Sequence, residues 1–173
     1  MELNEEIVKE YFCSVKKCFI QENVLYKVTT KRDGKKKGGG WSDIDLLAYS
    51  PLDNKMLDIE VKYREKAPFH RGTDRASNLD KVINNFSLES RIAKIDELNP
   101  QLLLVEHIFV TNRKAFTEKT RAEYESLLVK NKITLIYFED IFKELQSHFK
   151  ENPNKMTSVI GQMLRMLNNQ NES

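Results

Sequence analysis

The chain has 173 residues, of which 40% are hydrophobic and 31% are charged, and its net charge is +2. This length and composition predict one globular domain that is large enough to bury a real hydrophobic core. The sequence has no apolar run long enough to cross a bilayer, and its acidic first ten residues are unlike a signal peptide. We therefore expect a soluble, cytoplasmic protein.

The first predicted element is an amphipathic helix. Asn4 is a candidate N-cap, and the apolar residues recur at helical spacing: Ile7, Val8, Tyr11, Phe12, Val15, Cys18 and Phe19. At about 100° per residue, Glu5 lies on the border of the apolar stripe, whereas Glu6 lies nearly opposite it. Glu5 is therefore a candidate site residue. The alternative is a first-turn acid favoured by the helix dipole.

A strand is predicted over residues 24–29, and a basic segment overlaps its end. Residues 27–37 carry six basic side chains and a single acid, Asp33, and run into Gly38-Gly39-Gly40. We interpret this segment as a flexible loop with a glycine hinge that holds a phosphate backbone, and the alternative is an ordinary solvated hairpin tip. The candidate nucleic-acid contacts are Lys31, Arg32, Lys35, Lys36 and Lys37.

Residues 41–62 predict a β-hairpin. Its two arms, 44–49 and 56–63, are rich in strand formers and flank the turn residues 51–54. If Ser50 pairs with Lys55, the register of the hairpin is fixed along both arms.

This register places acidic side chains together. Asp45 falls opposite Glu60, with Cβ atoms about 4.5–5.5 Å apart, close enough for two carboxylates to share one divalent cation. Lys62 shares a strand face with Glu60 and Asp58, and Asp43 falls opposite Lys62. An exposed edge-strand face would explain Glu60 and Lys62 alone. Asp45 lies in an apolar run, where a carboxylate needs a partner such as a metal or Lys62.

A second polar stretch, residues 63–78, is predicted to be a loop near the hairpin. Its arginines, Arg64, Arg71 and Arg75, are further candidate contacts to a nucleic-acid backbone. His70 could serve there as a general base, but a lone loop histidine is more often a surface residue.

The rest of the chain predicts alternating helices and strands. A helix is predicted over 77–95 by an apolar stripe: Leu79, Val82, Ile83, Phe86, Ile92 and Ile95. Beyond it we expect a buried strand over 102–111, a capped helix over 117–129, a strand over 133–138 and a helix from near Asp140 through Phe149. Pro153 marks a boundary between a main domain, 1–150, and a C-terminal helical extension, 151–173. The apolar stripe of the extension could pack on its own domain or mediate a homodimer, and residues 168–173 should fray.

Together these features resemble the PD-(D/E)XK nuclease superfamily, over roughly residues 5–145. Asp45, fifteen positions before Glu60-Val61-Lys62, looks like the superfamily's signature. The stretch Ile44-Asp45-Leu46-Leu47-Ala48 is similar to that of archaeal Holliday junction resolvases, with Ile where they carry Pro, and residues 109–136 are similar to Mrr-like domains.

The resemblance implies an α/β fold of the restriction-endonuclease-like class, with an αβββαβ core, a mixed central sheet flanked by helices and an extra C-terminal helix. It implies that Asp45 and Glu60 bind Mg²⁺ or Mn²⁺, that the Val61 carbonyl assists, and that Lys62 orients or activates the attacking water. Many members add a glutamate from the first helix, here Glu5.

The sequence therefore predicts a metal-dependent nuclease that hydrolyses DNA phosphodiester bonds, with RNA left open as a substrate. The alternative is a catalytically silent, nuclease-like module that binds nucleic acid or a partner within a defence or repair complex. The intact set of Asp45, Glu60 and Lys62 favours the enzyme.

Overall fold

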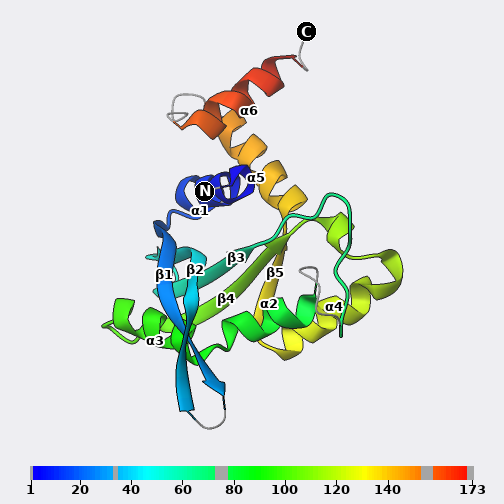
Figure 1. Ribbon diagram of the computed structural model, residues 1–173. Coiled ribbons are helices and arrows are strands. Elements are labelled where there is room, and N and C mark those ends of the chain that lie inside the picture. The colour runs from blue at the N-terminus through cyan, green and yellow to red at the C-terminus, as the bar shows by residue number, and fades with distance from the viewer. Residues whose placement is uncertain (1, 33–34, 73–77, 153–157, 171–173) are drawn as a thin grey trace.

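The computed structural model describes residues 2–32, 35–72, 78–152 and 158–170 (Figure 1). A five-stranded sheet forms its middle layer, in the order β1-β2-β3-β4-β5. The strands are β1 (Phe19–Arg32), β2 (Lys35–Ser50), β3 (Lys55–Val61), β4 (Leu104–Thr111) and β5 (Ile133–Tyr137). The first three strands pair antiparallel, whereas β3, β4 and β5 pair parallel, so the sheet is mixed as predicted.

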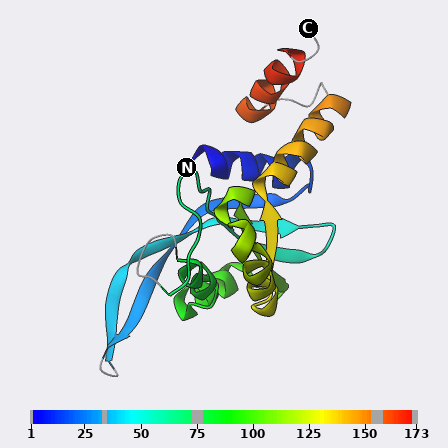
Figure 2. The ribbon, with the colours of Figure 1, turned by 90° about the vertical axis from the view of Figure 1, so that its right-hand side faces the viewer.

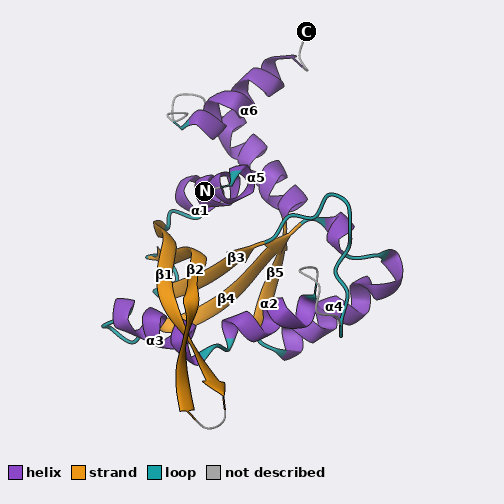
Figure 3. Ribbon diagram, in the orientation of Figure 1, coloured by secondary structure: helices purple, strands orange, loops and turns teal. Residues whose placement is uncertain are grey.

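Helices cover both faces of this sheet (Figures 1 and 3). One face packs against α1 (Leu3–Ser14) and α5 (Phe138–Glu151), and α6 (Val159–Gln170) packs on these two helices. The other face packs against α2 (Leu79–Phe86), α3 (Glu89–Leu98) and α4 (Glu118–Lys130), and a short 3-10 helix, Arg113–Ala115, follows β4. The chain thus has the predicted element order, a helix and three strands followed by helical crossovers to two parallel strands.

Strand β3 divides its side chains between the two faces. Ile59 and Val61 lie in the apolar core with α1 and α5. Asp58 and Glu60 alternate with them and therefore point toward α2 and α3. The predicted division of this strand into an apolar face and a polar face is confirmed.

The single helix predicted over 77–95 is wrong, because the structure has two helices there. Ser87 ends α2, with its backbone N–H and its hydroxyl both donating to the carbonyl oxygen of Asn84. Leu88 then has extended dihedral angles and starts α3 as its N-cap. The break gives α3 its own direction, and it buries Arg91 and Ile95 while Ile92, counted in the predicted stripe, is 41% exposed.

The N-terminal helix is also shorter than its apolar pattern predicts. Its N-cap is Glu2 rather than Asn4, and the helix ends at Ser14. Lys17 has a positive φ of 57°, and the backbone N–H of Cys18 returns to the carbonyl of Phe12. This turn directs the chain into β1, so Cys18 and Phe19 continued the apolar spacing only by coincidence.

The basic segment predicted as a flexible loop forms a hairpin arm instead. Strands β1 and β2 stay paired as far as Arg32 and Lys35, and the arm extends beyond the rest of the sheet (Figures 1 and 2). The glycine run lies within β2 and is not a hinge. A Cβ added to Gly39 would lie 2.5 Å from the carbonyl oxygen of Val28, where the ladder shifts register, so the close approach of the strands needs glycine there.

The C-terminal helix α6 packs on the same chain. Ile160 and Leu164 are buried in the core shared with α1 and α5. The helix includes residues 168–170, and 171–173 lie outside the described residues. Among the helices that the structure describes, none has the length and apolar character needed to cross a lipid bilayer.

Candidate metal and phosphodiester site

Asp45 lies where the pairing between β2 and β3 ends. The β2–β3 ladder has the predicted register from Ser50 and Lys55 to Leu46 and Ile59, and it ends there. One residue further along β2, the Oδ2 atom of Asp45 accepts a hydrogen bond from the backbone N–H of Val61 at 2.7 Å. The carboxylate thus takes the place of a backbone acceptor, and the strands separate beside it.

The other neighbour of Asp45 is irregular as well. The β1–β2 ladder pairs Glu22 with Leu46 and Val24 with Ile44, and it omits the pair between Asn23 and Asp45. Asn23 has a positive φ of 48°, a conformation that asparagine adopts more readily than most residues. Asp45 therefore sits at an interruption of both ladders, where its side chain is available for other contacts.

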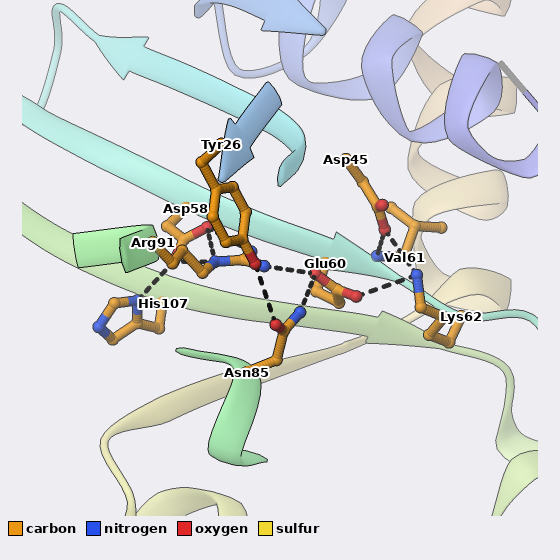
Figure 4. A network of polar contacts seen from close by, with 9 residues as sticks. All are labelled: Tyr26, Asp45, Asp58, Glu60, Val61, Lys62, Asn85, Arg91 and His107. Atoms are coloured by element: carbon orange, nitrogen blue, oxygen red, sulfur yellow. Dashed lines mark hydrogen bonds and ion pairs between the residues drawn. The ribbon is translucent and has the colours of Figure 1, made fainter. Parts of the chain in front are cut away.

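Lys62 joins Asp45 to Glu60 (Figure 4). Its Nζ atom lies 3.1 Å from Oδ2 of Asp45 and 3.0 Å from Oε1 of Glu60. The side chains of Asp45 and Glu60 are 7% and 6% exposed, whereas that of Lys62 is 39% exposed. The structure therefore brings the three predicted residues into one cluster, with buried carboxylates behind a lysine that solvent can reach.

Burial and like charge act together on this cluster. Burial, followed by the negative charge of Glu60, raises the pKa of Asp45 to about 6, against the opposing effects of Lys62 and the Val61 N–H. Burial lowers the pKa of Lys62, but the charges and hydrogen bonds of Glu60 and Asp45 outweigh it, and the net pKa is raised. Lys62 is therefore an ammonium group at neutral pH.

An arginine that the sequence interpretation missed completes the surroundings of Glu60. Arg91 of α3 is fully buried, and its Nη1 lies 2.9 Å from Oε2 of Glu60 while its Nη2 lies 2.6 Å from Oδ1 of Asp58. The available signal was its spacing, because Arg91 precedes the buried Ile95 by one helical turn. The predicted apolar stripe counted Ile92 as buried, so the buried position of Arg91 was not recognised.

The polar network continues around these ion pairs (Figure 4). Asn85 donates from Nδ2 to Oε2 of Glu60 at 3.2 Å, and it accepts at Oδ1 from the Tyr26 hydroxyl at 3.2 Å. Nδ1 of His107 lies 2.9 Å from Oδ2 of Asp58. Side chains from β1, β4, α2 and α3 therefore surround the two acids of β3.

Glu5 does not join this cluster. Its carboxylate accepts from the backbone N–H of Glu2 at 3.1 Å in a capping box, on a helix that covers the opposite face of the sheet. Within the described residues, no group of three or more His, Cys, Asp and Glu side chains could hold a metal ion. Asp43 pairs with Leu25 of β1, beyond the end of the ladder that was predicted to set it opposite Lys62.

The predicted nucleic-acid contacts lie in several places. Lys31, Arg32, Lys35, Lys36 and Lys37 belong to the strands of the hairpin arm. Arg64 lies over the Phe69 ring at 4.7 Å, and Arg71 pairs with Asp80 and Glu123. Arg75 lies outside the described residues. Arg64 and Arg71 thus already contact the protein's own side chains.

Comparisons with known proteins add little to this geometry. No protein-family model and no curated protein matches the chain. Among solved structures, the MunI restriction endonuclease in complex with cognate DNA is similar over 90% of this chain and 90% of that chain, with a TM-score of 0.45 and 13% identity. The chain's own element order and strand pairing therefore define its fold.

Proposed function

We propose that the protein is a metal-dependent nuclease that hydrolyses DNA phosphodiester bonds at Asp45, Glu60 and Lys62. The observation that carries this proposal is the position of the Lys62 ammonium, which lies within 3.1 Å of two buried carboxylates while its own side chain remains partly exposed. A phosphodiester that approached this opening would meet a cation backed by two acids.

The acids fit a hard divalent cation. Carboxylate oxygens are the ligands that Mg²⁺ and Mn²⁺ prefer, and two buried carboxylates that repel each other gain most from a shared cation. The raised pKa of Asp45 reflects that repulsion together with burial. Asp45 and Glu60 would hold the metal, with the Val61 carbonyl as a further ligand. When bound, the metal would lower the pKa of a water molecule and offset charge on the scissile phosphate.

Lys62 would contribute charge rather than take up a proton. Its pKa is raised, so Lys62 stays protonated at neutral pH and can donate hydrogen bonds to a phosphate oxygen or to the attacking water. A fixed donor of this kind stabilises the negative charge that develops in the transition state.

The hairpin arm is our candidate for the surface that holds the DNA backbone. Its sequence carries Lys31, Arg32, Lys35, Lys36 and Lys37, and strand β2 leads directly from the arm to Asp45. A basic arm beside a phosphodiester site would bind duplexes of different sequence with similar affinity. RNA remains the competing substrate.

A silent nuclease-like module is the second candidate, and one observation favours it. Arg91 and Asn85 already bind Oε2 of Glu60, while Lys62 binds Oε1. A carboxylate with so many internal partners can be a purely structural group. In that case the protein would bind nucleic acid or a partner without cleaving.

Cleavage assays separate the two candidates. Purified protein is incubated with plasmid, single-stranded DNA, branched DNA and RNA, each with Mg²⁺, Mn²⁺ or chelator. We expect metal-dependent cleavage of DNA that Asp45→Asn removes. The matched control, Asp53→Asn, changes an exposed aspartate in the β2–β3 turn and should cleave like the wild type. Binding without cleavage under all conditions would favour the silent module.

A further inference from the structure

The two oxygens of Glu60 have different partners (Figure 4). Oε1 faces Lys62 at 3.0 Å, on the side of Asp45. Oε2 faces the interior and receives hydrogen bonds from Nη1 of Arg91 at 2.9 Å and from Nδ2 of Asn85 at 3.2 Å. The carboxylate is therefore fixed in rotation, with a single oxygen toward the site.

Arg91 is itself held rigidly. Its Nη2 lies 2.6 Å from Oδ1 of Asp58, its Nε lies 3.2 Å from both oxygens of Asp58, and its guanidinium lies 5.0 Å from the Phe86 ring centroid. Arg91 and Asp58 have no solvent-exposed side-chain surface. If this buried arginine turned away, Asp58 and Oε2 of Glu60 would lose their ion pairs with it, so this geometry is strongly favoured.

We propose that Arg91 is a positioning residue, which holds Oε2 of Glu60 so that only Oε1 is presented to the site. Asp58 then acts as the counter-ion that fixes Arg91, although it shares a strand face with Glu60. This inference rests on the proposed function where it concerns metal binding, because the ligand oxygen it assigns belongs to the proposed metal site.

The expected size of the effect follows from how such supporting contacts behave. Loss of a hydrogen-bond partner behind a metal ligand typically costs about 10- to 100-fold in metal affinity or activity. Arg91 supplies the charged bond to Oε2 and Asn85 supplies a neutral one, and charged hydrogen bonds are roughly twice as strong. Arg91 should therefore contribute most of the positioning.

The test uses a variant that preserves the charge balance. Arg91→Met alone would leave Asp58 and Glu60 buried without their arginine and could fail to fold. The double variant Asp58→Asn with Arg91→Met removes one cation and one anion, and such replacements of a buried pair are often tolerated. The matched control is Asp140→Asn with Arg113→Met, which removes an ion pair between half-exposed side chains.

Two measurements are made on each variant: the crystal structure without metal, and the affinity for Mn²⁺ by calorimetry. We expect the Asp58/Arg91 variant to release Oε1 of Glu60 from Lys62 and to bind Mn²⁺ about 10- to 100-fold more weakly. The control variant should match the wild type. Glu60 unmoved in the Asp58/Arg91 variant, with unchanged Mn²⁺ affinity, would overturn the inference.

The crystal structures also keep the two proposals apart. If the wild type binds no Mn²⁺ and cleaves nothing, the proposed function fails. The position of Glu60 in the Asp58/Arg91 variant then still decides whether Arg91 holds it.

Discussion

Two clusters of paired acidic and basic side chains lie on the polar face of β3, and they differ in their access to solvent. The Asp58–Arg91 pair is completely buried and closed by several hydrogen bonds. The cluster of Glu60, Lys62 and Asp45 contains a cation that solvent can reach. A fully buried (closed) pair can stabilise the fold and hold neighbouring side chains in place. In a pair that solvent can reach (an open pair), a ligand can displace one partner. Solvent access therefore distinguishes a structural ion pair from a candidate site on the same strand.

The largest expected effect of a single substitution on turnover is at the open cluster. Lys62→Ala should leave Mn²⁺ binding largely intact but lower the single-turnover cleavage rate by about 10²- to 10³-fold, because its charge acts mainly in the transition state. The control is Lys55→Ala, which removes a lysine at the other end of β3, paired with Glu106. Equal cleavage by the Lys62 variant and the wild type would place the chemistry elsewhere.

Loss of the buried pair between Asp58 and Arg91 should lower the free energy of unfolding. Arg91→Met leaves two buried carboxylates without their arginine and should lower the free energy of unfolding by about 3–5 kcal/mol. Arg113→Met breaks an exposed pair with Asp140 and should cost at most about 1 kcal/mol. Urea denaturation of both variants measures the difference. Similar losses in the two would remove the distinction between closed and open pairs.

A third effect concerns pH, and it arises from Asp45. Its pKa is raised from 3.8 to about 6, first by burial and then by the charge of Glu60. The folded state therefore favours the protonated acid. The resulting stabilisation is fully present below the ordinary pKa and is lost as pH rises through about 6.

At about 1.4 kcal/mol per pKa unit, this stabilisation amounts to roughly 3 kcal/mol. The free energy of unfolding of the wild type minus that of Asp45→Asn should therefore fall by about that amount between acidic and neutral pH. Chelator keeps metal out of the measurement. If the difference in unfolding free energy between the wild type and Asp45→Asn stays constant with pH, the pKa of Asp45 is not raised in the folded protein.

The smallest expected effect lies away from both clusters, on the arm. Changing Lys35, Lys36 and Lys37 to Ala should flatten the salt dependence of DNA affinity, by roughly 0.9 in the log–log slope for each lost phosphate contact. Cleavage at saturating DNA should change much less. The control changes three exposed lysines of α4 and the turn after it, Lys119, Lys130 and Lys132. An identical slope in both triple variants would move the binding surface away from the arm.

The sequence predicted the β2–β3 hairpin and the alternation of β3 because these signals are local. Alternation in β3 separates Ile59 and Val61 from Asp58 and Glu60, and the turn residues fix the pairing of Ser50 with Lys55. Thr117 caps α4 as its pattern indicates, with its hydroxyl accepting from the N–H of Thr120. These features depend on neighbours within one strand, turn or helix.

The parts that were missed depend on contacts between distant segments. Arg91 meets Asp58 across 33 positions of sequence, and no periodicity within α3 indicates which strand it faces. Glu5 has two uses that its helical position cannot distinguish, and the structure shows the local one. The arm was predicted as a loop because glycines and lysines are rare in strands, and the close approach of Gly39 to Val28 appears only once the strands pair.

In the proposed function, Asp45 and Glu60 together hold a divalent cation beside Lys62. Crystals of the wild type soaked in Mn²⁺ test it directly through anomalous scattering. We expect a peak between the carboxylates of Asp45 and Glu60, on the Oε1 side of Glu60, with the Lys62 ammonium moved from its bridging position. Crystals in which Mn²⁺ binds elsewhere, while Lys62 still bridges the two carboxylates, would contradict it.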